Sequence, residues 1–525
     1  MVAASSSVDV ASKQTLPGGG RIEHRAAKVS FVTGLSTLLT MIFQLISVPV
    51  CLSYWGKESY GTWLALFSAF MLLRSLDGGF AVYVGNKLNY LYHQDIAALR
   101  GHLSSSLAGV LVIASLELML AGGTLISEPL ATVLGMPAGQ ASDVSAKLGL
   151  LALMISWVLT GSYLGIVHRL LIPAGLMYQA AWWAMAFQVT QFGAIMAAAV
   201  MKFSMLQASL LFALSQLIIY VSSALYVRHK MPAFSPWLRG FRLRTGLSDL
   251  SKSLLLTAST LIQQTATNGA VLLVAAVAAP IAVPVFTTVR TLTNLWTSVT
   301  TVLTTPLLPD VVRFHAKGEV HKLVTVNQAF WVFVGSAVNC GTLLSYPLLP
   351  FVYDRWTAHA VALDKPLLCL MLGAVVLTNA GALMALYLNG VNRLQIGLGT
   401  SVTRAVLGLG LGALGFGRLG LTSFGLGILV AELAALLING RYFLKHELAE
   451  NDPDVRAAAF GPVTLSTGSA SLFFVGAAFG WWSSQWSWLL GLSGVAVGAV
   501  WGWKTLEPEL QARFTNLVAR PYRRA

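Results

Sequence analysis

The feature that most restricts the fold of this chain is a series of apolar stretches that follow one another along most of its length. Fourteen of them are long enough to cross the ~30 Å hydrocarbon core of a membrane, which takes roughly 20 residues. They lie at about 28–53, 59–84, 101–126, 147–168, 176–200, 204–227, 253–279, 284–310, 325–345, 366–388, 395–416, 421–443, 458–480 and 486–503. Only 10% of the residues are charged, against ~25% in soluble domains. The sequence therefore predicts an all-α polytopic membrane protein of about fourteen transmembrane helices.

The basic residues are distributed unevenly between the two sides of the membrane. If the N-terminus is cytoplasmic and every stretch crosses, 25 of the 34 Lys and Arg residues fall in cytoplasmic segments, 6 in external ones and 3 within stretches. This is the positive-inside pattern of membrane proteins. It predicts a multi-pass protein of the inner (plasma) membrane with both termini in the cytoplasm. It also accounts for the net charge of +14 without a nucleic-acid partner.

The richest basic segment, Arg228 to Lys252, divides the chain after six stretches. Because six is even, six further stretches would have the same orientation as the first six. The alternatives for this segment are a tether resting on anionic headgroups and a specific binding site. The predicted organisation is a disordered cytoplasmic tail (1–27), an N-terminal six-helix lobe (28–230), a basic cytoplasmic linker (231–252), a parallel C-terminal six-helix lobe (253–445), two further helices (446–503) and a basic cytoplasmic tail (504–525).

Two of the stretches carry matching rows of polar residues on one helical face. The rows share the spacing 4, 3, 4, 3 and are 220 residues apart: Thr33, Thr37, Thr40, Gln44 and Ser47, and Ser253, Thr257, Thr260, Gln264 and Thr267. Stretch 284–310 carries a third row, which includes Asn294. Such rows also serve ordinary helix packing in membranes. A repeat with the substrate site between its halves is, however, a known transporter plan, and we expect Thr40, Gln44, Thr260, Gln264 and Asn294 to face a hydrated substrate chamber.

Residues 48–89 resemble a family of known transporters. Gly56, Tyr60-Gly61 and Trp63, followed by Asp77-Gly78-Gly79 and Asn86, are similar to the polysaccharide flippases of the multidrug/oligosaccharidyl-lipid/polysaccharide exporter superfamily, and 401–436 resembles that family's eleventh and twelfth spans. The resemblance implies translocation of an undecaprenyl-diphosphate-linked oligosaccharide (O-antigen type) by alternating access, for cell-surface polysaccharide export. It makes this lipid-linked substrate and membrane lipids the expected partners, with polysaccharide polymerase and export proteins as candidates. Asp77 and Gly79 match the family's Asp-Gly signature, whereas Arg74 departs from it.

Three charged residues lie inside predicted spans and are candidate substrate ligands. Arg74 and Asp77 are three residues apart, so they either bind the substrate, Arg74 through its diphosphate, or form a structural i, i+3 ion pair. Arg290 lies on the third polar row with no acid within one turn. An unpaired Arg at that depth should face water or an anion, and we interpret it as a ligand for the diphosphate.

The other charged residues within predicted spans, and the three cysteines, are not candidate substrate ligands. Arg404 and Glu432 are predicted to pair between adjacent antiparallel helices. Glu117 either carries a coupling proton or hydrogen-bonds hydroxyl neighbours, and the sequence does not choose between the two. Cys51, Cys340 and Cys369 have no metal-ligand or CxxC spacing, and we interpret them as packing residues.

Two rival classes remain. A membrane-bound acyltransferase is suggested by His359 and Asp364, which match an HxxxxD pattern, but this short pattern lies in a small external loop. A polysaccharide ligase would need a larger external loop than the chain offers, and no carboxylate pair, metal cluster or phosphate-binding glycine loop is present. The sequence thus predicts no enzyme, metal or cofactor. A drug or cation exporter of the same superfamily is the alternative, although spans 28–53, 253–279 and 284–310 contain no carboxylate before Asp310 at the inner end of the last one.

Overall fold

The computed structural model describes residues 19–512 except 93, 135–140, 236, 238–239, 392, 448–452, 483–486 and 509. Every regular element within these residues is a helix. The first half of the chain contains α1 (Gly19–Leu73), α2 (Ser75–Tyr92), α3 (Ile96–Gly123), α4 (Glu128–Val133), α5 (Ala141–Trp157), the π-helical turn η1 (Val158–Leu164), α6 (Gly165–His168), η2 (Arg169–Leu171), α7 (Met177–Val200), α8 (Met205–Lys230) and η3 (Pro232–Phe234). The predicted tail 1–27 lies mostly outside the described residues.

The second half begins after the basic linker. It contains α9 (Leu243–Gln264), the π-helical turn η4 (Thr265–Gly269), α10 (Ala270–Ala278), η5 (Pro280–Ala282), α11 (Val283–Thr304), η6 (Thr305–Leu307), α12 (Leu308–Ala316), α13 (Val320–Phe330), η7 (Trp331–Gly335), α14 (Ser336–Ser345), α15 (Leu349–Trp356), α16 (Lys365–Gly390), α17 (Leu394–Leu419), α18 (Thr422–Tyr442) and η8 (Phe443–Glu447). Two further helices, α19 (Pro453–Ala478) and α20 (Trp488–Thr505), follow.

The helices are membrane-spanning by length and composition. Ten helical runs in the described part of the chain are long and apolar enough to cross a bilayer. The first run, Gly34–Leu73, has 40 residues, about 60 Å at 1.5 Å per residue, which is twice the hydrocarbon thickness. Gly56 inside it has φ 75° and ψ 176°, so two helices meet there at a kink, between predicted stretches 28–53 and 59–84. The multi-pass helical fold is confirmed, and the count of fourteen crossings stays a prediction.

The same backbone turn recurs at the matching place in the second half. Ala279 follows α10 with φ 64° and ψ 159°, close to the values at Gly56, and lies 223 residues after it. Both residues separate the first predicted span of a half from the second. Because only glycine adopts this conformation without strain, two independent occurrences at equivalent positions support an internal repeat.

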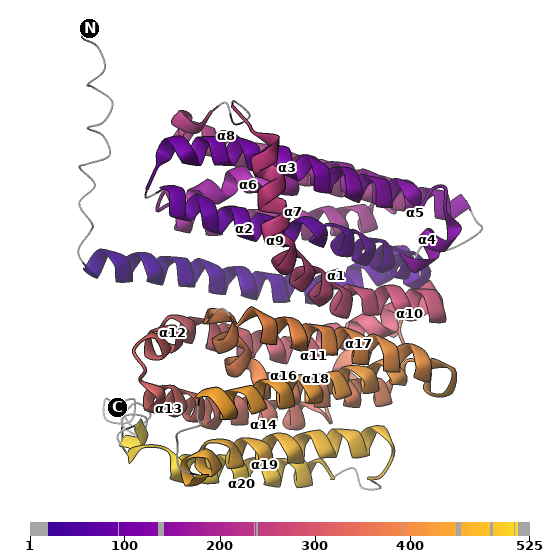
Figure 1. The fold of residues 1–525 in the computed structure, drawn as a ribbon. Helices are drawn as coiled ribbons and strands as arrows, with labels where there is room; N and C mark the ends of the chain where they lie inside the picture. Colours follow the sequence, from indigo (N-terminus) through magenta and orange to yellow (C-terminus); the bar gives the residue numbers. More distant parts are fainter. Residues whose placement is uncertain are drawn as a thin grey trace, which may run out of the picture.

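The halves form two layers, with the C-terminal pair outside the second (Figure 1). Helices α2 to α8 lie in one layer and α10 to α18 in the other, while α19 and α20 cover the far side of the second layer. One hydrophobic cluster joins the layers, since it includes Trp63 and Phe70 of the first half and Phe286 and Phe424 of the second. Helix α9 departs from this division, because it crosses the first layer and packs along α2 and α3.

Candidate functional site

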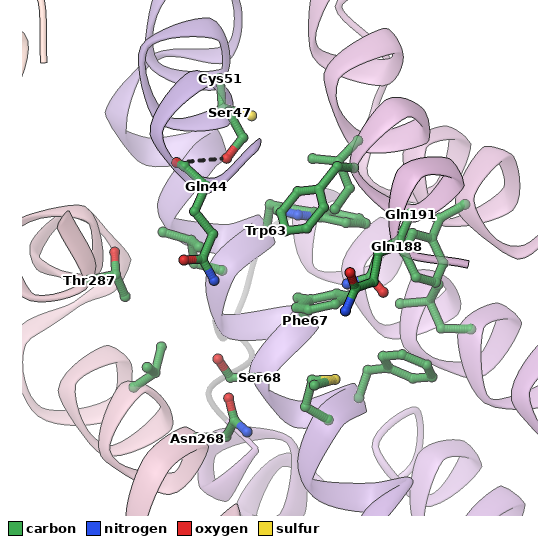
Figure 2. Close-up of a pocket in the computed structure, with 18 of the residues that line it drawn as sticks. Gln44, Ser47, Cys51, Trp63, Phe67, Ser68, Gln188, Gln191, Asn268 and Thr287 are labelled. Atoms are coloured by element: carbon green, nitrogen blue, oxygen red, sulfur yellow. Dashed lines mark hydrogen bonds between the residues drawn. The ribbon is translucent and has the colours of Figure 1, made fainter. Parts of the chain in front are cut away.

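A cavity of about 540 Å³ lies between the two halves. Gln44, Trp63 and Phe67 reach it from α1, and Gln188 and Gln191 reach it from α7. The opposite wall comes from the second half, where Thr287 of α11 and Asn268 of η4 face these residues (Figure 2). The walls are therefore polar on both sides, as a chamber for water or a polar substrate requires.

A second cavity, of about 460 Å³, adjoins the first. The two share wall residues, among them Arg74, Trp157 and Tyr220. The second cavity extends along α2 and α9, where it is lined by Asp77 and Thr260. We refer to the two cavities together as the chamber.

The structure brings all eight candidate site residues to this chamber. Thr40, Gln44, Arg290 and Asn294 line the first cavity, Asp77, Thr260 and Gln264 line the second, and Arg74 lines both. The residues come from the first two predicted spans of each half. Their role in substrate binding stays a prediction.

Arg74 and Asp77 do not form the ion pair that the sequence left open. No contact within 4 Å joins their charged groups in the described structure; instead Trp157 stands between them. The Arg74 guanidinium carbon lies 4.5 Å from the centre of a Trp157 ring, a cation–π contact. The indole Nε1 of Trp157 donates to Oδ2 of Asp77 at 3.1 Å, and the hydroxyl of Ser162 donates to the same oxygen. The acid is thus satisfied by neutral donors, which leaves the guanidinium N–H groups of Arg74 free to bind an anion.

Arg290 is held at the edge of the first cavity. Its Nη1 donates to the backbone carbonyl of Thr267 at 2.6 Å, and the guanidinium lies 5.9 Å from the ring centre of Phe286. It pairs with no acidic side chain in the described part of the chain. A guanidinium has five N–H donors, so a single carbonyl leaves most of them for a ligand.

Arg169 is a chamber residue that sequence reasoning missed. It was counted among the cytoplasmic cations, yet it lines the second cavity together with Arg74 and Asp77. It forms no side-chain hydrogen bond or ion pair with the described residues. The described residues of the chamber walls therefore include three arginines and one acidic residue. These are Arg74, Arg169 and Arg290, and Asp77.

The wall contributed by the first half is also rich in aromatic and amide groups. Phe187 and Tyr220 stack face to face with ring centres 4.2 Å apart. The side-chain oxygen of Gln188 accepts hydrogen bonds from the hydroxyls of Ser36 and Thr40, each at 2.8 Å. Aromatic faces and amides are groups that bind either sugar rings or flat apolar molecules. Sequence reasoning did not single them out, because an aromatic residue in an apolar stretch looks the same whether it faces a chamber, a core or lipid.

The remaining charged candidates lie outside the chamber. Nε and Nη2 of Arg404 bind the two carboxylate oxygens of Glu432 at 2.8 and 2.7 Å, so the predicted structural pair is confirmed. Glu117 is fully buried, and neither of its carboxylate oxygens has a hydrogen-bond donor among the described residues. The hydroxyl-bonding alternative is therefore not the one observed.

The HxxxxD pattern does not form a catalytic pair. His359 lies 2.7 Å from Asp354, and Asp364 accepts a hydrogen bond from the backbone N–H of Leu367 as the N-cap of α16. The two pattern residues thus have separate structural partners.

No protein-family model matches the chain, and no curated protein matches its sequence. Solved structures share its fold. One, described as the inward-facing conformation of a multidrug resistance MATE family transporter of the MOP superfamily, aligns with a TM-score of 0.60 over 80% of this chain and all of its own, at 15% identity. A MATE protein in complex with MaD3S aligns with a TM-score of 0.56 over 81% of this chain and 96% of its own, at 17% identity. A MOP superfamily transporter from Pyrococcus furiosus, described by the reverse polarity of its binding pocket, has a TM-score of 0.55, the same coverage and 15% identity. The chain therefore has the fold of the MATE transporters of the MOP superfamily.

Proposed function

We propose that the protein is a membrane transporter that moves an anionic, sugar-bearing lipid by alternating access. The substrate that fits best is an undecaprenyl-diphosphate-linked oligosaccharide, flipped from the inner to the outer leaflet of the inner membrane for cell-surface polysaccharide export. The observation that carries this proposal is the excess of cations in the chamber, where Arg74, Arg169 and Arg290 outnumber Asp77.

The physical argument rests on the cost of a charge inside a membrane. An arginine at the bilayer centre costs from ~2.5 to more than 10 kcal/mol, and this cost falls when a cavity or a counter-ion is present. Asp77 accepts hydrogen bonds from the neutral donors Trp157 and Ser162 and forms no ion pair with the three arginines in the described structure. A diphosphate carries the missing charge, and its oxygens match the planar fork of a guanidinium group. The polar rows and glutamines supply donors and acceptors for sugar hydroxyls.

Export of drugs or organic cations is the second candidate. It is favoured by the described multidrug resistance of a structural neighbour and by the aromatic wall that includes Trp63, Phe67 and Tyr220. Flat cations bind aromatic faces well. The cation excess argues against them, because a cationic drug would have to enter a chamber that already carries surplus positive charge.

A binding experiment separates the two candidates. Trp63 and Trp157, two of the 15 tryptophans of the chain, line the chamber, so the fraction of the protein fluorescence that a ligand quenches, and that is lost from a Trp63→Phe, Trp157→Phe variant, reports occupancy. Undecaprenyl diphosphate is titrated against undecaprenyl monophosphate and ethidium. Saturable quenching that is strongest for the diphosphate, and weaker after Arg169→Gln, supports the flippase. Tighter binding of ethidium, with no effect of Arg169→Gln, supports the drug exporter. Lipid-linked sugars that accumulate in a deletion strain would then identify the glycan.

A further inference from the structure

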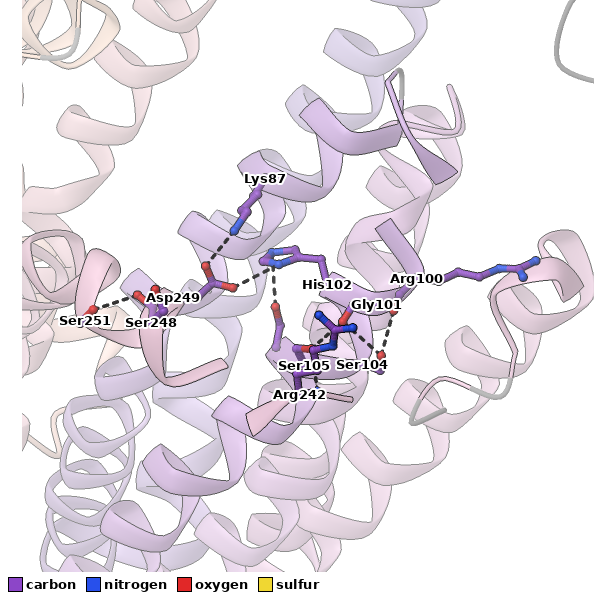
Figure 3. A network of polar contacts seen from close by, with 11 residues as sticks. Lys87, Arg100, Gly101, His102, Ser104, Ser105, Arg242, Ser248, Asp249 and Ser251 are labelled. Carbon is purple, nitrogen blue, oxygen red and sulfur yellow. Dashed lines mark hydrogen bonds and ion pairs between the residues drawn. The ribbon is translucent and has the colours of Figure 1, made fainter. Parts of the chain in front are cut away.

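A polar cluster around one buried carboxylate lies beyond the chamber, on the side of the basic linker. Asp249 of α9 is 1% exposed. Its Oδ1 accepts a hydrogen bond from Nζ of Lys87 at 2.9 Å, and its Oδ2 lies 3.1 Å from Nδ1 of His102 (Figure 3). Lys87 belongs to α2 and His102 to α3, so one carboxylate of the second half joins two helices of the first. We call these three residues the α9 latch.

The latch lies at the end of the second cavity. Asp249 precedes Thr260, which lines the second cavity, by eleven residues on α9. Lys87 follows Ala81, which also lines it, by six residues on α2, or about 9 Å at 1.5 Å per residue. The helices touch at backbone level on both sides of Asp249. A Cβ atom at Gly79 would overlap the backbone of Thr257, and one at Gly246 would overlap the carbonyl of Ser105. Helix α9 thus joins the second half to the first at this end of the chamber.

The two halves touch in a different way at the opposite end. There a Cβ atom at Gly61 of α1 would overlap the carbonyl of Pro280 in η5, and the indole Nε1 of Trp356 donates to the carbonyl of Leu45 at 2.6 Å. No ion pair joins the two halves there within the described residues. The two halves thus touch at both ends, and at the linker end a buried carboxylate, Asp249, joins them through an ion pair.

We propose that the α9 latch is the gate at the linker side of the chamber, and that its opening separates α9 from α2 and α3. Asp249 is buried while Lys87 is about a third exposed. Loss of Lys87 leaves a buried carboxylate that favours a hydrated, open arrangement, and loss of the Asp249 charge removes the ion pair that joins α9 to α2. Asp249 is therefore a switch for access rather than a substrate ligand. This inference needs a chamber that opens alternately to the two sides, and it holds for either candidate substrate.

The test uses a single cysteine that lines the second cavity near the linker end. Thr260→Cys is placed in the full-length protein after Cys51, Cys340 and Cys369 have been replaced by serine. The rate of modification by a membrane-impermeant maleimide is measured in inside-out vesicles and, separately, in intact cells. Asp249→Asn and Lys87→Gln should each raise the rate roughly 10-fold or more from the linker side and leave the rate from the other side unchanged.

Two control variants match these changes. Lys252→Gln removes an exposed cation from α9 that pairs with no acidic residue in the described structure, and Lys87→Arg keeps a cation in the latch; both should label at the parent rate. Equal rates in all variants would overturn the proposal. A rise from both sides would also overturn it, since it would show that Asp249 serves overall helix packing. Neither result would bear on which substrate the chamber binds.

Discussion

At the scale of single residues, the arginines inside the membrane fall into two groups. Arg404 donates from Nε and Nη2, one edge of its guanidinium group, to both carboxylate oxygens of Glu432. Arg74, Arg169 and Arg290 have no such carboxylate partner in the described structure, and all three line the chamber. The first arrangement stabilises the fold by itself, whereas the second leaves donors available for a ligand.

The Arg404–Glu432 pair predicts a strong dependence of stability on both partners. Glu432→Ala should lower the free energy of unfolding by roughly 3–5 kcal/mol, because it leaves a charge inside the membrane without its partner. The double change Arg404→Leu with Glu432→Leu should recover most of this loss. Thermal unfolding in detergent, at one heating rate for all variants, is the measurement. A double variant less stable than the single one would rule out this account.

Arg290 predicts an effect on transport without loss of the fold. Arg290→Ala should weaken substrate binding or turnover roughly 10-fold or more, because hydrogen bonds to charged groups are lost. Arg290→Lys should keep part of the function, since it retains the charge without the fork. Surface polysaccharide in a complemented deletion strain, at matched membrane abundance, measures both. Full polysaccharide output from Arg290→Ala would mean that Arg290 has only a structural role, through its hydrogen bond to the Thr267 carbonyl.

The site was predictable where it follows helical periodicity and not elsewhere. The spacing of Gln44, Gln264 and Asn294 indicated a common chamber, and all three line it. Arg169 follows the π-helical turn η1, which inserts an extra residue and rotates what comes after it. The helical face on which Arg169 lies therefore cannot be found by assuming 100° per residue. Its place at the end of an apolar stretch also suggests the membrane surface instead of a chamber wall.

At the scale of elements, the kink at Gly56 and the turn at Ala279 repeat one backbone conformation with different residues. A Cβ at Gly56 meets no atom within 4 Å, so the only cost of alanine there is backbone strain. At Ala279 that strain is already present, because non-glycine residues at such angles cost about 1–3 kcal/mol.

These two positions give opposite predictions. Ala279→Gly should raise the stability by about 1 kcal/mol, and Gly56→Ala should lower it by about 1–3 kcal/mol. Differential scanning fluorimetry of the two purified variants beside the parent protein provides the comparison. Destabilisation by Ala279→Gly would mean that the flexibility gained by the unfolded chain outweighs the relief of strain.

At the scale of the whole molecule, the two-lobe helical architecture could be predicted because lipid leaves few alternatives. A chain of long apolar stretches must form helices that satisfy their own backbone, and the parity of the stretches orients the halves. The path of α9 across the first layer could not be predicted in this way. It depends on small residues such as Gly79 and Gly246, whose close contacts are not visible in hydropathy.

The topology remains to be measured. The distribution of Lys and Arg predicts that residues 228–252 are cytoplasmic and 353–365 external. In intact cells, an impermeant thiol reagent should modify a cysteine at position 359 and spare one at position 239. The opposite pattern would reverse the orientation and, with it, the side on which the α9 latch opens.

If the protein works as the proposed flippase, the cation excess of the chamber also couples it to the membrane voltage. A hydrated chamber takes the electrical potential of the side to which it is open, and each elementary charge is worth ~2.3 kcal/mol per 100 mV. Arg74, Arg169 and Arg290 against Asp77 give an empty chamber a surplus of two positive charges. An interior-negative voltage therefore favours the empty protein open to the cytoplasm, and a bound diphosphate cancels this bias. The energised membrane would thus reset the unloaded carrier without acting on the loaded one.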